Sequence, residues 1–135
     1  MSQITVEGGK PLVGRVDLKG AKNLVTKAMV AALLGETPSI LRDVPKISDV
    51  EDVQGLLELH GVTIDFDDAG VMKLDPSKVK SARMVDIDAH AGSSRIPILF
   101  CGPLLHRLGE AFIPGLGGCE IGNRPVDFHF DVLRA

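Results

Sequence analysis

The chain of 135 residues contains no tryptophan and no tyrosine, and phenylalanine occurs only five times. Proteins that bind single-stranded nucleic acid stack bases on aromatic side chains, and most nucleic-acid-binding domains carry a basic surface. Here 15 basic residues face 18 acidic ones, which gives a formal net charge of -3. These shortages argue against a protein that binds nucleic acid.

Long apolar runs are also missing. No run reaches the roughly 20 residues that a membrane-spanning helix requires. The first residues, MSQITVEG, lack the basic and then apolar pattern of a secretory signal peptide. We therefore expect a cytoplasmic protein without a membrane partner.

Cysteine is scarce, and the two cysteines differ in their surroundings. In the cytoplasm both thiols are expected to stay reduced. Cys101 lies in the apolar segment ILFCG, which is typical of a small core residue. Cys119 lies between glycines and Glu120, where a thiol is accessible and reactive. Since the chain has no Cys-x-x-Cys motif and no paired histidine spacing, we predict no metal site and no cofactor.

Hydrophobic periodicity predicts an α/β domain made of two successive units. The first unit is predicted as strands at 3–7 and 13–18, a helix at 22–34, a strand at 38–43, a helix that starts at a capping box formed by Ser48 and Glu51 and ends before Gly61, and strands at 62–66 and 71–74. The second is predicted as a strand at 85–89, a helix at 94–108, a strand at 110–113 and a helix at 125–134.

The tripeptide Leu-Gly-Glu occurs at residues 34–36 and again at 108–110, which supports an internal repeat. The second unit stops inside its second helix, without closing strands. We therefore expect repeated βαβαββ units that are truncated after about one and a half units, as in a piece of a longer protein.

Basic residues are predicted near three helix starts: Lys22, Arg95 and Arg124. A cation there opposes the positive end of the helix dipole, so its presence favours a site that receives a multiply charged anion. His60, by contrast, is predicted at a helix end, where a positive charge is favourable.

Four motifs follow one another along the chain: GAKN at 20–23, VPKISDV at 44–50, Arg95 followed by GPL at 102–104, and GGCEIGNRPVDFH at 117–129. With these motifs in this order, the chain resembles the N-terminal third of the UDP-N-acetylglucosamine 1-carboxyvinyltransferases, which are enolpyruvyl transferases. The cysteine loop followed by RPVD is the most specific of the motifs. The related enolpyruvyl transferases of the shikimate pathway share the fold and lack this loop.

The resemblance implies an inside-out α/β barrel of the enolpyruvyl transferase type. In that family, two globes of three units each close around the substrates. Residues 1–20 would then be N-terminal strands that pack with the second globe, and residues 21–135 would be a partial first globe, with one complete unit and a truncated second.

The resemblance also implies transfer of the enolpyruvyl group from phosphoenolpyruvate to the 3-hydroxyl of UDP-N-acetylglucosamine, the first committed step of peptidoglycan synthesis. Cys119 would be the catalytic acid or covalent acceptor, and the thiol that fosfomycin alkylates. Lys22 would hold phosphoenolpyruvate and Asn23 the sugar nucleotide. Arg95 and Arg124 would line the anionic site. The turn that follows would hold the uridine through Arg124, Pro125, Val126, Asp127 and Phe128.

This reaction also needs a general base near the sugar hydroxyl, and no residue of the chain is a convincing one. Asp49 is interpreted as part of the capping box. The isolated chain is therefore expected to be inactive, with self-association through an open sheet edge and an apolar helix face. Three alternatives remain: a binding module for UDP-sugars or other anions, a shikimate-pathway enolpyruvyl transferase, and a thiol-dependent redox or acyl-transfer domain.

Overall fold

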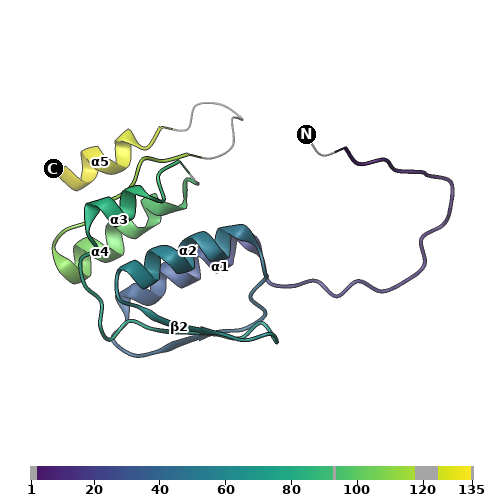
Figure 1. Ribbon diagram of the computed structural model, residues 1–135, viewed down its shortest axis with the longest axis horizontal. Coiled ribbons are helices and arrows are strands. Elements are labelled where there is room, and N and C mark those ends of the chain that lie inside the picture. The colour runs from purple at the N-terminus through teal and green to yellow at the C-terminus, as the bar shows by residue number, and fades with distance from the viewer. Residues whose placement is uncertain (1–2, 93, 118–124, 135) are drawn as a thin grey trace.

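The computed structural model describes residues 3–92, 94–117 and 125–134. The elements in chain order are α1 (Lys22–Ala31), the 3-10 turn η1 (Ala32–Leu34), β1 (Ser39–Leu41), α2 (Ser48–Leu59), β2 (Thr63–Phe66), β3 (Met72–Asp75), α3 (Met84–Asp88), the 3-10 turn η2 (Ile96–Phe100), α4 (Cys101–Leu108) and α5 (Asp127–Arg134). The strands form an antiparallel sheet in the order β1-β3-β2. Helices α1 and α2 lie side by side over one face of this sheet (Figure 1).

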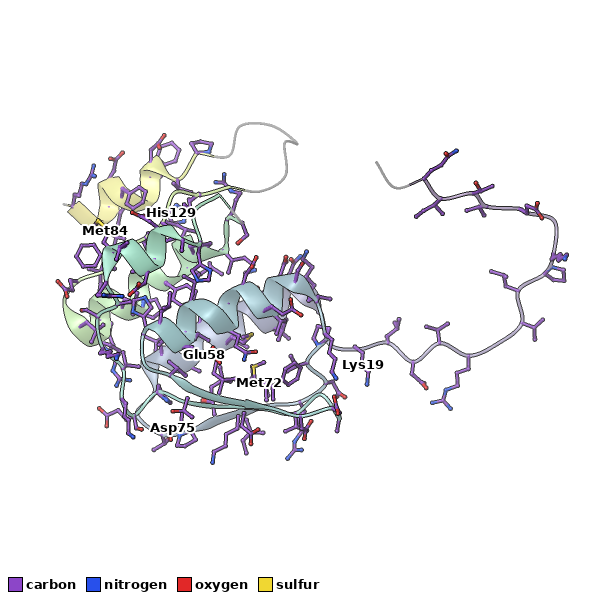
Figure 2. The ribbon with its side chains drawn as sticks, viewed as in Figure 1. Lys19, Glu58, Met72, Asp75, Met84 and His129 are labelled. Atoms are coloured by element: carbon purple, nitrogen blue, oxygen red, sulfur yellow. The ribbon has the colours of Figure 1, made fainter. Side chains whose placement is uncertain are left out.

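The central strand β3 connects the sheet to the helices. Leu74 lies opposite Ser39 of β1 and Ile64 of β2. Met72 and Leu74 are fully buried, whereas Lys73 between them is exposed, as the alternation of a strand with one covered face requires. Figure 2 shows Met72 on the side of the sheet that the helices cover. The core continues upward through fully buried helix residues: Met29, Leu33, Val53, Leu57 and Leu104.

The structure confirms both predicted helices and the last three predicted strands of the first unit. The start of α2, however, differs from the prediction. Ile47 has an extended backbone (φ -138°, ψ 153°), and its carbonyl accepts the amides of Val50 at 3.0 Å and Glu51 at 3.4 Å. Ser48 is thus already the first helical residue, and within the described structure no side chain caps this helix. The predicted capping box was wrong, because the Ile47 backbone takes the place that Ser48 was expected to occupy.

Residues 3–19 form an extended arm that leaves the body of the protein (Figure 1). The apolar side chains of the arm are all at least 83% exposed: Ile4, Val6, Leu12, Val13, Val16 and Leu18. The strands predicted at 3–7 and 13–18 are not formed in the described part of the chain. A strand requires the backbone of a neighbouring strand for its hydrogen bonds, and the described sheet pairs only β1, β2 and β3.

The second half also departs from prediction, at its expected strands. Residues 84–88 form the short helix α3 instead of a strand. The Arg83 guanidinium binds both carboxylate oxygens of Asp86, at 2.7 and 2.8 Å, and Ile87 is buried. This contact between residues three apart fits a helical turn and not an extended strand, in which the two side chains point to opposite faces.

Residues 110–113 form no ladder either, because the expected partner strand is helical. The chain beyond them is instead tied to the loop before η2. Gly92 donates its amide to the Gly115 carbonyl at 2.7 Å, and Gly117 donates to the Ser94 carbonyl at 3.0 Å. The helix predicted at 94–108 is confirmed as η2 followed by α4, with Pro97 in the first turn of η2. The helix predicted at 125–134 is confirmed as α5.

Candidate functional site

Helices α1, α2, α4 and α5 all run in the same direction in Figure 1, from the end where the arm leaves the body toward the opposite end. The turn η2, which leads into α4, packs against both α1 and α2. A helix start carries unpaired amides and roughly half a positive charge. The neighbouring starts of α1 and α2, which no side chain caps in the described structure, therefore offer unpaired amides to an anion.

Lys22 is the first residue of α1 and points across to α2. Its Nζ lies 2.7 Å from Oδ2 of Asp49, in the first turn of α2. The Lys22 side chain is 62% exposed and that of Asp49 only 22%. The ion pair thus joins two helix starts and leaves the ammonium open to solvent. Sequence reasoning missed this contact, because the motif around Ser48 resembled a capping box.

Asn23 follows Lys22 on α1 and is exposed. Its backbone carbonyl accepts a hydrogen bond from Nζ of Lys27 at 2.9 Å, one helical turn further along. The Asn23 side chain, with one amide donor group and one carbonyl acceptor, lies on the same helix turn as the Lys22 ammonium. The two neighbours can therefore contact different parts of one ligand.

Arg95 immediately precedes η2 and is half-buried (φ -96°, ψ -5°). Its neighbour Ser94 accepts the Ile96 amide with its hydroxyl at 3.2 Å, and accepts the Gly117 amide with its carbonyl. Gly117 lies two residues before Cys119 in the sequence. The structure thus connects the segment that carries Arg95 to the segment that leads into the cysteine loop.

The cysteine loop itself lies outside the described residues, and with it Cys119 and Arg124. The residues after the loop are described at the start of α5. Pro125 is exposed and Val126 half-buried, and the Val126 carbonyl accepts the His129 amide at 2.9 Å. Asp127 is the first residue of α5, where a carboxylate is favoured by the helix dipole, and Phe128 is 75% exposed.

Cys101 is confirmed as a core residue. It opens α4 with only 8% of its surface exposed, and burial raises the pKa of its thiol. A raised pKa favours the neutral thiol, which is a poor nucleophile. Cys101 therefore contributes packing and no chemistry.

His60 differs from the expectation of a charged residue at a helix end. It is 3% exposed, its Nδ1 lies 3.2 Å from the Lys80 carbonyl, and its ring centroid lies 6.1 Å from that of Phe100. Burial lowers the pKa of His60, and the hydrogen bond to Lys80 only partly opposes this shift. His60 is thus a neutral residue of the core, and its side chain donates from Nδ1, since a carbonyl can only accept.

No cluster of three or more His, Cys, Asp and Glu side chains in residues 3–92, 94–117 and 125–134 has the arrangement of a metal site. None of the helices in the same ranges is long and apolar enough to cross a membrane.

Comparison with known proteins finds relatives over nearly the whole chain. A family model described as EPSP synthase (3-phosphoshikimate 1-carboxyvinyltransferase) matches residues 6–135. The UDP-N-acetylglucosamine 1-carboxyvinyltransferase of Protochlamydia amoebophila (strain UWE25) is 41% identical over 136 residues, which cover 99% of this chain and 29% of that protein. The protein of the same name from Acidiphilium cryptum (strain JF-5) is 39% identical over 135 residues, which cover 100% of this chain and 32% of its own length.

Among solved structures, the enolpyruvyl transferase NikO from Streptomyces tendae superposes with a TM-score of 0.64. The superposition covers 76% of this chain and 23% of NikO, at 20% sequence identity. The described fold is therefore that of an enolpyruvyl transferase, which confirms the expected fold type.

The family model and the curated relatives place the chain among the enolpyruvyl transferases. It belongs to the family described as EPSP synthase, and its curated relatives at about 40% identity carry the name UDP-N-acetylglucosamine 1-carboxyvinyltransferase. The resemblance drawn from the motifs is thereby confirmed. The chain spans about a third of the length of these relatives.

Proposed function

We propose that the protein to which these residues belong transfers the enolpyruvyl group of phosphoenolpyruvate to the 3-hydroxyl of UDP-N-acetylglucosamine, at the start of peptidoglycan synthesis in the cytoplasm. The observation that carries this proposal is Lys22, an exposed ammonium at the start of α1, in a chain about 40% identical to proteins named for this activity. Phosphoenolpyruvate brings a phosphate and a carboxylate, and each requires a cationic partner.

In this proposal Lys22 and Arg95 bind the anionic groups of phosphoenolpyruvate, and Asn23 binds the sugar nucleotide. Arg124 joins the anionic site, and the turn from Arg124 to Phe128 holds the uridine. The hydrogen bond from the Gly117 amide to the Ser94 carbonyl supports this assignment. It joins the neighbour of Arg95 to a residue two positions before Cys119 in the sequence. Cys119 delivers the proton to the methylene carbon or forms a covalent adduct there, and is the thiol that fosfomycin alkylates.

The proposal extends to the arrangement of the chain within the longer protein. Residues 21–135 form part of the first globe of an inside-out barrel, up to about one and a half βαβαββ units. The apolar side chains of residues 3–19 are exposed here, and residues 1–20 would gain strand partners in a second globe. The arm at residues 3–19 supports this assignment because its alternating pattern lacks a covering surface in the described structure.

A binding experiment distinguishes the substrates. We would titrate the ¹⁵N-labelled chain with UDP-N-acetylglucosamine, with phosphoenolpyruvate and with shikimate 3-phosphate, and follow amide shifts. Shifts at residues 21–23 and 126–128 with the sugar nucleotide, absent with shikimate 3-phosphate, support the proposal. Shifts with shikimate 3-phosphate alone would transfer it to the shikimate-pathway reaction.

Turnover requires more than binding. A chain that spans about a third of its relatives lacks the surfaces that exclude water in the closed enzyme, and Asp49 is engaged with Lys22. We expect phosphate release from the two substrates to equal the blank for this chain alone. Sugar-dependent release above the blank would show that these 135 residues already contain the general base.

A further inference from the structure

We propose that Asp49 is a positioning residue that acts through Lys22, and this inference rests on the proposed function. Asp49 holds the Lys22 ammonium between the starts of α1 and α2, so that the cation is in place before phosphoenolpyruvate arrives. The juxtaposition is direct, since Lys22 Nζ and Asp49 Oδ2 are 2.7 Å apart.

The local chemistry of α1 explains why this hold is needed. Lys22 stands at the positive end of its own helix, which repels it. The first turn of α1 contains no acidic residue, and in the described structure no side chain caps it. The carboxylate that offsets the repulsion comes from Asp49 on the neighbouring helix, and without it the long lysine side chain would turn away into solvent.

The exposure of the two side chains also supports a role of Asp49 in holding Lys22. Asp49 is largely covered and Lys22 is largely open. An ammonium has three N–H donors, so one donor to Asp49 leaves two for a ligand. Asp49 is therefore the fixed partner and Lys22 the group presented to an incoming anion, with little conformational freedom left to lose on binding.

The start of α2 also does not depend on Asp49 alone. The backbone of Ile47 makes the first contacts of α2, and Glu51 supplies a second carboxylate in the same first turn. Loss of the Asp49 charge thus leaves the helix start with an acidic residue. Glu51→Gln is a matched control, because it removes the same charge from the same turn on an exposed residue.

The first measurement needs no substrate. Asp49→Asn, Glu51→Gln and wild-type chain are treated briefly with an acetylating reagent, and each lysine is quantified by mass spectrometry. Lys27 is the internal standard, since it lies on the same helix and bonds to the Asn23 carbonyl instead. We expect Lys22 acetylation to rise several-fold relative to Lys27 in Asp49→Asn only. An unchanged Lys22 rate would overturn the proposal.

The second measurement tests whether Asp49 acts through Lys22. Phosphoenolpyruvate is titrated into wild type, Asp49→Asn, Lys22→Met and the double variant, with amide shifts as the readout. We expect Asp49→Asn to weaken binding about two- to fivefold, the range of a partly exposed ion pair. The effect should vanish in the Lys22→Met background. An equal effect with and without Lys22 would show a merely structural role and overturn the proposal.

The two measurements also separate this inference from the proposed function. If wild type binds no phosphoenolpyruvate and acetylation of Lys22 still rises in Asp49→Asn, the hold on Lys22 is supported and the anion site in this chain is rejected. If wild type binds and the Lys22 rate does not change, the site stands and the role of Asp49 is rejected.

Discussion

Nη1 of Arg107 donates a hydrogen bond to the carbonyl of Leu33 across 2.8 Å, and so connects the last turn of α4 to the end of η1. The same nitrogen also contacts the Gly35 carbonyl. Carbonyls at a helix end lack intrahelical partners, and a guanidinium satisfies them while it opposes the negative end of the dipole. Arg107 thereby joins the two predicted units of the chain.

Replacement of Arg107 should therefore cost stability. We expect Arg107→Ala to lower the free energy of unfolding by about 1.5–3 kcal/mol, the range for hydrogen bonds to charged groups. Arg107→Lys, which keeps a donor and the charge, should recover part of the loss. Urea denaturation measures both. Arg83→Ala, which breaks an exposed pair with Asp86, is the control and should leave the midpoint unchanged. Arg107→Ala with a wild-type midpoint would contradict the assignment.

Gly20 should tolerate no side chain. Its amide donates to the Asp43 carbonyl at 2.9 Å, and a Cβ built on Gly20 would lie 2.7 Å from that same oxygen. Gly20→Ala must shift the backbone just before Lys22, and we expect a loss of about 1–3 kcal/mol. Gly14→Ala on the arm, where a Cβ meets nothing within 4 Å, should have no effect on unfolding. Equal midpoints for both variants in urea would refute the close approach.

The burial of His60 predicts a pH-dependent stability. Its pKa is lowered in the folded protein, so the unfolded chain takes up a proton first as the pH falls. Stability should be full above the ordinary value of about 6.5 and decline below it, by at most about 1.4 kcal/mol per pH unit for this group. Urea denaturation between pH 5.5 and 7.5 measures the slope.

His60→Gln should reduce that slope, even if the variant is less stable at every pH. The control is His106→Gln on α4, where the side chain is exposed. A slope that is the same in His60→Gln and in wild type would show that other groups cause the pH dependence.

The two cysteines should differ in reactivity. Cys101 is buried with a raised pKa, whereas Cys119, outside the described residues, follows Gly117 and Gly118 in the sequence and is expected in a loop. We expect brief treatment of the folded chain with iodoacetamide to label Cys119 and spare Cys101, as read by peptide mass mapping. In Cys119→Ser, label should appear only after addition of denaturant. Preferential labelling of Cys101 in the folded chain would reverse the assignment.

Self-association is expected from two apolar surfaces of the described chain. One is the arm at residues 3–19. The other is a cavity of about 500 Å³ between the η2–α4 segment and α5, lined by Ile98, Leu99, Cys101, Gly102, Phe128, His129, Val132 and Leu133. Sedimentation velocity at rising concentration should show dimers or larger species. Leu12→Asp combined with Val13→Asp should reduce them, whereas Lys10→Ser should not. A monomer at millimolar concentration would contradict this expectation.

How far the sequence predicted the structure depends on where each segment finds its partners. The helices α1, α2, α4 and α5 were predictable, because apolar periodicity marks the face that packs. Strands were also predicted at 3–7, 13–18, 85–89 and 110–113, but they are not formed in the described structure. Alternation shows which side chains a strand would bury, but it does not show whether a neighbouring strand is present to pair with it. The pairing of Lys22 with Asp49 joins residues far apart in the sequence, and the misassigned capping box at Ser48 concealed it.

The common direction of α1, α2, α4 and α5 divides the molecule along one axis. Lys22, Asp49 and the Ser94 connection lie at the helix starts, whereas His60 follows α2 and Arg107 bonds beyond α1, at the helix ends. Replacing the side chains of Lys22 or Asp49 should thus change recognition with little change in melting, and replacing those of His60 or Arg107 should do the opposite. Stabilising substitutions near His60 and Arg107, at the helix ends, should therefore leave the ligand preference unchanged.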